Sequence, residues 1–70
     1  MFISLSHCND VKEFIKIAQD ITGNVEVKSG KYVVDGKSIL GIFSLDLSQP
    51  VELVCESENE YLKFKKFESK

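Results

Sequence analysis

The residues that could carry chemistry lie in two short stretches of the sequence. One is GKYVVDGKSILG, residues 30–41, where a Gly-Lys-Ser triplet follows an earlier glycine and opens an apolar run. The other is the pair His7 and Cys8, of which His7 is the only histidine in the chain. Gly-Lys-Ser after a glycine is typical of loops that hold nucleotide phosphates, whereas histidine and cysteine are nucleophiles. The two stretches therefore suggest a bound nucleotide or a covalently modified side chain.

The spacing in the first stretch argues against a nucleotide loop. The spacer between the first glycine and the triplet, residues 31–35, is one residue longer than the motif allows. It also contains Val33 and Val34, whose β-branched side chains favour an extended backbone that cannot curl around phosphates. Two interpretations of Ser38 remain. It can cap a short helix, which stabilises the helix by roughly 1 kcal/mol, or it can be phosphorylated at the positive end of that helix.

Composition limits the classes of function. The chain has 70 residues, which we interpret as one domain over residues 1–70, and a net charge of −2 with lysine as its only strongly basic residue. The negative net charge argues against a nucleic-acid partner, and no apolar run is long enough for membrane insertion. Cys8 and Cys55 have no metal-binding spacing and are expected to be reduced thiols, or one disulfide, so we expect a cytoplasmic protein without metal or cofactor.

An amphipathic helix is the clearest element that the sequence predicts. Its apolar residues recur at three or four positions and form one stripe: Val11, Phe14, Ile15, Ala18 and Ile21. Either Asn9 or Asp10 can cap the start of this helix. Asp10 with Glu13 would make a variant of the capping box, and Gly23 supplies a stop signal.

The remaining pattern predicts an α+β fold. Four strands are expected, at residues 2–6, 24–28, 31–35 and 51–56. Ser29 and Gly30 would form the turn of a hairpin between the second and third. A short helix over residues 38–43 and a closing helix over 58–67 complete the order β-α-β-β-α-β-α. This order indicates a four-stranded antiparallel sheet with helices on one face.

The alternation assigns side chains to the two faces of that sheet. The expected inward residues are Ile3, Leu5, Val25, Val27, Val34, Leu53 and Cys55. The opposite face should hold Glu26, Lys28 and Glu52 in water. The closing helix is expected to bury Tyr61 and Phe64, together with either Leu62 or Phe67.

The short helix after Ser38 has more apolar residues than one buried side requires. A helical period places Ile39, Leu40 and Phe43 on one side, with Ile42 and Leu45 on the other. Either side could pack in the core. We favour an exposed docking patch formed by the first group, because the segment 38–45 carries no charge and is flanked by Lys37 and Asp46.

The pattern KSIxGxxSL, made by Lys37, Ser38, Ile39, Gly41 and residues 44–45, resembles that of HPr, the histidine-containing phosphocarrier family of the bacterial phosphoenolpyruvate-dependent sugar phosphotransferase system. The resemblance runs without a gap from His7 through Leu45, and more loosely beyond. It implies the open-faced β-sandwich of that family.

The resemblance also implies a role for His7. Counting back from KSI places it at the family's phosphate-accepting histidine, at the start of the first helix. The neighbouring motif differs, because Asn9 stands in place of the family's arginine and Asp10 in place of its proline. Both changes disfavour a bound phosphate, through a lost cation and an added like charge. The alternative is that His7 is only a solvated residue at a helix end. Cys8 as a thiol nucleophile lacks a positioned base.

By the same resemblance, Ser38 matches a serine that a dedicated HPr kinase phosphorylates, and Ile39, Leu40 and Phe43 match the family's docking residues. The implied partners are enzyme I, sugar-specific IIA domains and a catabolite-control regulator. The expected function is a carrier or regulator in sugar transport and carbon catabolite regulation rather than an enzyme, since no catalytic constellation is present. The alternative is an interaction module that keeps the fold without phosphotransfer.

Overall fold

The structure is a computed structural model that describes residues 1–69. Its elements follow the predicted order β-α-β-β-α-β-α, with a 3₁₀ helix continuing the last one. Their bounds are β1 (Phe2–Ile3), α1 (Cys8–Gln19), β2 (Val25–Ser29), β3 (Tyr32–Asp35), α2 (Ile39–Phe43), β4 (Val51–Cys55), α3 (Glu58–Tyr61) and η1 (Leu62–Phe67).

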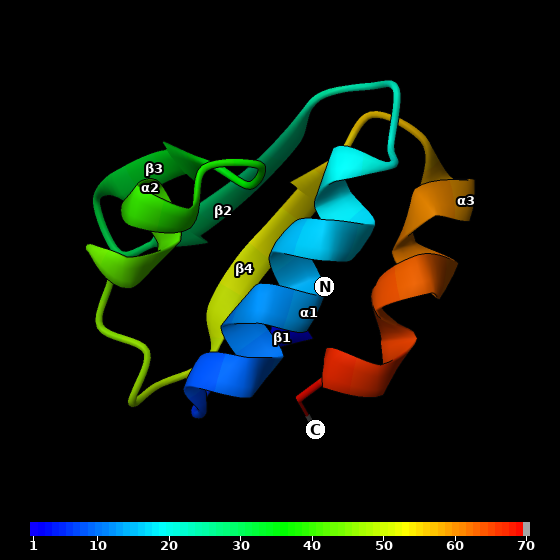
Figure 1. Ribbon diagram of the computed structural model, residues 1–70. Coiled ribbons are helices and arrows are strands. Elements are labelled where there is room, and N and C mark those ends of the chain that lie inside the picture. The colour runs from blue at the N-terminus through cyan, green and yellow to red at the C-terminus, as the bar shows by residue number, and fades with distance from the viewer. Residues whose placement is uncertain (70) are drawn as a thin grey trace.

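The four strands form one antiparallel sheet in the order β1-β4-β2-β3. Val27 at its centre lies opposite Leu53 on one side and Val34 on the other. Figure 1 shows α1, α2 and the α3–η1 segment on the same side of this sheet. The predicted fold class, a four-stranded open antiparallel sheet covered by helices, is therefore confirmed.

The core lies between the sheet and α1, and it contains the predicted apolar stripe. All five stripe residues are buried, together with the inward residues of the strands, of which only Val34 is partly exposed. The predicted outer residues are exposed or half-buried: Glu26, Lys28 and Glu52. Buried polar or charged side chains are absent from this core within residues 1–69.

The start of α1 differs from the prediction. His7 is the N-cap residue, with an extended backbone, and its side chain makes no capping hydrogen bond. Asn9 and Asp10 lie inside the first turn, so neither caps the helix and the predicted capping box is wrong. The helix starts earlier, at Cys8, because the His7 carbonyl accepts hydrogen bonds from the Asp10 and Val11 amides. The Asp10 carboxylate instead lies near the positive end of the helix dipole.

The end of α1 and the hairpin turn also shift. The helix ends at Gln19 with Asp20 as its C-cap, and Gly23 lies beyond it. Ser29 pairs with Tyr32, so the turn residues are Gly30 and Lys31 rather than Ser29 and Gly30. Gly30 has a φ of 59°. Glycine at the first central position is characteristic of the II′ hairpin turn, whose twist matches that of the strands.

The closing helix is only partly α-helical. After α3, the chain tightens into η1, which has the narrower 3₁₀ geometry. Side chains three residues apart eclipse in such a helix, so Phe64 and Phe67 both point into the core while Leu62 points into water. The prediction that Tyr61 and Phe64 are buried is confirmed for Phe64, and Tyr61 is half-buried.

The first strand is shorter than the predicted segment 2–6. Only Phe2 and Ile3 pair with β4, although Leu5 is buried as predicted. The other side of β1 is occupied by the chain after η1. Ile3 forms a bridge with Glu68, and the Ser4 amide donates to the Phe67 carbonyl at 2.8 Å. These bonds end the strand and cover its outer edge.

Replacing Gly36 by alanine should destabilise the protein by roughly 1–3 kcal/mol, as overpacking of a tight site does. A Cβ at Gly36 would lie 2.5 Å from Val25 Cγ1 and 3.0 Å from the Val25 carbonyl oxygen. Gly23→Ala is the matched control, because its Cβ would meet only the flexible end of Glu56. Urea unfolding measures both variants, and equal stability of the two would contradict this packing.

Candidate functional site

Ser38 is the N-cap of α2, as the sequence predicts. Its Oγ accepts a hydrogen bond from the Gly41 amide at 3.1 Å, and its carbonyl accepts one from the Ile42 amide at 3.0 Å. Its own amide donates to the Asp35 carbonyl at 3.0 Å. Ser38, a half-buried residue, is thus held at the point where the chain passes from the hairpin into α2.

Lys37, which precedes the cap, has a role that sequence reasoning missed. Its Nζ donates to the Ile21 carbonyl oxygen at 2.6 Å, and its amide donates to Asp35 Oδ1 at 2.9 Å. The lysine therefore ties the start of α2 to the chain just beyond α1. No sequence signal indicated this contact, because the two residues lie in separate loops that only the tertiary fold brings together. The segment 30–36 forms a turn and β3, so it cannot be a phosphate loop.

The short helix α2 buries one side and exposes the other. Ile42 and Leu45 are buried in the core. Ile39, Leu40 and Phe43 are exposed, with 40%, 80% and 44% of their surfaces accessible. We call these three residues the α2 patch. Single exposed apolar residues are common, but three on one short helix next to a structured serine mark a candidate docking surface.

His7 occupies the other candidate position, the N-cap of α1. Its carbonyl accepts hydrogen bonds from the amides of Asp10 and Val11 at 3.0 and 3.2 Å. The imidazole is exposed and takes no part in capping. It is therefore accessible, beside a helix N-terminus whose orphan amides favour an anion.

The surroundings of His7 offer little further chemistry. Cys8 and Asn9 are exposed, and Asp10 brings a carboxylate to the first turn. Cys55 is a separate thiol in the core, where burial raises its pKa and the nearby Glu60 charge adds to the shift. Both cysteines are free. Among residues 1–69, no group of three or more His, Cys, Asp or Glu side chains could hold a metal ion.

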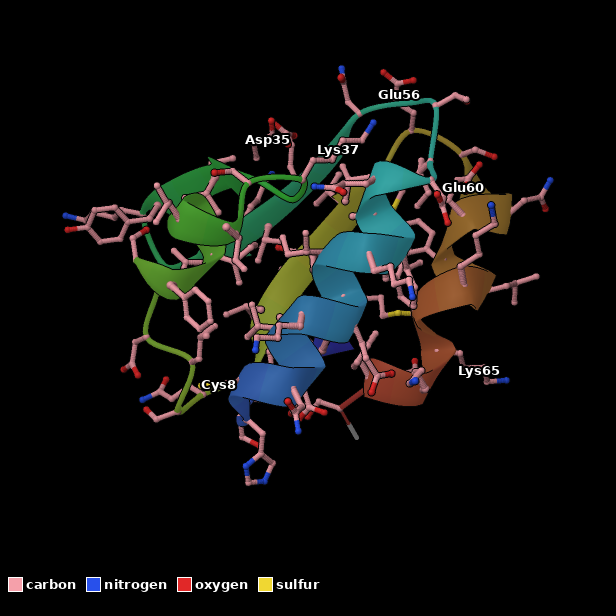
Figure 2. The ribbon with its side chains drawn as sticks, viewed as in Figure 1. Cys8, Asp35, Lys37, Glu56, Glu60 and Lys65 are labelled. Carbon is pink, nitrogen blue, oxygen red and sulfur yellow. The ribbon has the colours of Figure 1, made fainter. Side chains whose placement is uncertain are left out.

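Ser38 and the α2 patch belong to α2, whereas His7 lies at the start of α1. Figure 2 shows Cys8 at one end of α1 and Lys37 beside the other end. The helix has 12 residues, a length of about 18 Å at 1.5 Å per residue. Within the described residues, no helix is both long and apolar enough to cross a membrane.

Comparison with solved structures identifies the fold. HPr-C-His from Thermoanaerobacter tengcongensis superposes with a TM-score of 0.73 and 28% identity, over 93% of this chain and 79% of that one. The Bacillus subtilis catabolite repression protein Crh, whose structure is described as a domain-swapped intertwined dimer, superposes with a TM-score of 0.65 and 25% identity, over 94% and 77%. No protein-family model and no curated protein sequence matches.

The chain therefore has the HPr-like fold, and the family resemblance of the KSIxGxxSL pattern is confirmed at that level. HPr-like proteins are carriers and regulators rather than catalysts, so the likeness favours a phosphocarrier or regulatory class. The fold itself does not assign a role to His7, Ser38 or the α2 patch.

Removing the Ser38 hydroxyl should cost about 1 kcal/mol of stability, because the Gly41 amide loses its cap. Ser38→Ala tests this, and Ser38→Asp is the matched control, since aspartate caps as well as serine. Thermal unfolding of the two variants gives the comparison. Equal losses in both variants would show that the hydroxyl does not act as a cap.

Proposed function

We propose that this chain of HPr-like fold is a phosphocarrier or regulatory protein of the phosphoenolpyruvate-dependent sugar phosphotransferase system. It presents Ser38 and the α2 patch to larger partners in the cytoplasm and accepts phosphate at His7 with reduced efficiency. The partners are enzyme I, IIA domains, and an HPr kinase or catabolite-control regulator. The alternative is an interaction module of the same fold without phosphotransfer.

The observation that carries the proposal is the arrangement at α2. An apolar patch of three exposed side chains directly follows a serine that caps the helix. A phosphate on Ser38 would add up to two negative charges at the edge of this patch. A partner with a cationic group beside an apolar groove could then distinguish the two states of the protein, which is what a regulator requires.

A weaker observation supports phosphate transfer through His7. The imidazole is exposed and free of a capping bond. In the transfer, an imidazole nitrogen would form an N–P bond while the bond between phosphorus and the donor protein breaks. Asn9 provides no cation for the phosphate, and the Asp10 carboxylate repels it. We therefore expect slow or incomplete transfer.

Ser38 should be phosphorylated by an HPr kinase with ATP, in a reaction that joins the hydroxyl oxygen to the γ-phosphorus and releases ADP. Intact-protein mass spectrometry should detect one added phosphate on the wild type and none on Ser38→Ala. Ser44→Ala is the matched control, because Ser44 is an exposed serine at the other end of α2. An unmodified wild type, or equal labelling of Ser38→Ala, would remove the regulatory proposal.

Incubation with enzyme I and phosphoenolpyruvate should add an acid-labile, base-stable phosphate slowly, and His7→Ala should abolish it. Asn9→Arg should increase the initial rate by about tenfold, because a guanidinium would steady the phosphate through charge-assisted hydrogen bonds. Asn59→Arg is the control, because this substitution adds the same charge in α3, away from His7.

The two experiments separate the alternatives. If neither wild type nor Asn9→Arg accepts phosphate at His7 while Ser38 is modified, the protein is a regulator without a relay. If both sites stay unmodified, the interaction module remains and the proposed phosphotransfer function is wrong.

A further inference from the structure

The two edges of the sheet differ in how they are protected. At the β1 edge, Ile3 is bridged to Glu68, and the Ser69 amide donates to the Phe2 carbonyl at 2.8 Å. At the β3 edge, no further strand pairs with Tyr32–Asp35 within residues 1–69. Figure 1 shows β3 at the margin of the sheet, opposite the side on which α3 lies. An unprotected edge of this kind can pair with another chain.

The hydrogen-bond pattern identifies which backbone groups on β3 are available. The Gly36 amide donates to the Val25 carbonyl at 2.7 Å. In an antiparallel ladder every second residue bonds to its neighbour, so Val34 and Tyr32 also direct their groups toward β2. The amide and carbonyl of Val33 therefore point away from the sheet, into the space where an additional strand would lie.

The exposed side chains along this edge run from a lysine in the turn, through two largely apolar residues, to an aspartate at the end of β3. Tyr32 and Val33 are 72% and 53% exposed. Asp35 lies opposite Glu26 in the ladder, so two like charges face each other on the outer side of the sheet. Lys31, in the turn, carries the cation nearest to Val33 in the sequence.

We propose that the β3 edge binds the β3 edge of a second copy of this chain, antiparallel, with Val33 opposite Val33. Each Val33 amide would donate to the Val33 carbonyl of the other copy. In this register residues 31 and 35 oppose each other, so Lys31 of one copy meets Asp35 of the other, twice. Each Asp35 then gains a cation opposite the like charge of Glu26. The surface is self-complementary, which is the requirement for a two-fold dimer.

The attraction between Lys31 and Asp35 favours the register with Val33 opposite Val33 over registers shifted by two residues. If the second strand slides by two residues in either direction, Lys31 no longer lies opposite Asp35, and both attractive contacts are lost. Only a few residues of each β3 strand would pair, so the dimer should be weak. Salt should weaken it further, because it screens the exposed charge pairs.

Sedimentation equilibrium from about 10 μM to about 1 mM tests the proposal, because weak dimers dissociate in this range. The wild type should form a dimer reversibly. Val33→Pro should raise the dissociation constant at least tenfold, since proline has no amide hydrogen, and the fold should remain intact because that amide has no partner in the monomer. Val33→Thr keeps the amide and should dimerise like the wild type.

A second pair of variants tests the charges. Lys31→Glu should raise the dissociation constant roughly tenfold, because two attractive contacts become repulsive. Lys12→Glu, on the exposed side of α1, makes the same change of charge and should have no effect. A wild type that stays monomeric at the highest concentration, or a dimer that persists in Val33→Pro, would overturn the proposal. A dimer that persists in Val33→Pro would be formed by another surface.

Discussion

The ring of Phe14 holds the helical layer together. Its centroid lies 4.9 Å from that of Phe64 and 6.1 Å from that of Phe67, and all three side chains are buried. Aromatic contacts at these distances add to the burial of apolar area. They fix η1 against α1, and the chain after η1 then reaches β1, where Glu68 pairs with Ile3. The aromatic cluster therefore packs the closing segment against α1, close to the point where the chain pairs with β1.

The candidate site depends on that layer indirectly. A helix as short as α2 has little stability of its own, because helix nucleation is costly. It is held by the burial of Ile42 and by Lys37, whose ammonium binds the Ile21 carbonyl. The α2 patch is therefore exposed on a supported helix rather than on a mobile loop. Ser38 has the same support, and its amide, carbonyl and hydroxyl each have a backbone partner.

Sequence periodicity was sufficient to predict the elements that bury a single face. It predicted the α1 stripe, the hairpin strands, and the exposure of Leu40 opposite the buried Ile42. It failed where a tertiary contact determines the outcome. The 3₁₀ geometry of η1 places Phe64 and Phe67 in the core together. Helix α1 starts at Cys8, with the His7 carbonyl accepting two amides of the first turn, although Asn9 is the better capping residue. The place of His7 at the start of α1 was expected from the family resemblance, whereas its role as the N-cap residue without a side-chain cap was not.

The bonds that join β1 to the end of the chain also affect how the domain assembles. The hairpin closes a loop of only Gly30 and Lys31, whereas the bond from Ser69 to Phe2 closes a loop of almost the whole domain. The entropic cost of closing a flexible loop grows by about 0.6 kcal/mol for each doubling of its length. All pairings of β1 are of this long-range kind. The segment that leads from β1 to His7 is therefore ordered by residues far along the chain, and the position of His7 depends on the completeness of the whole fold.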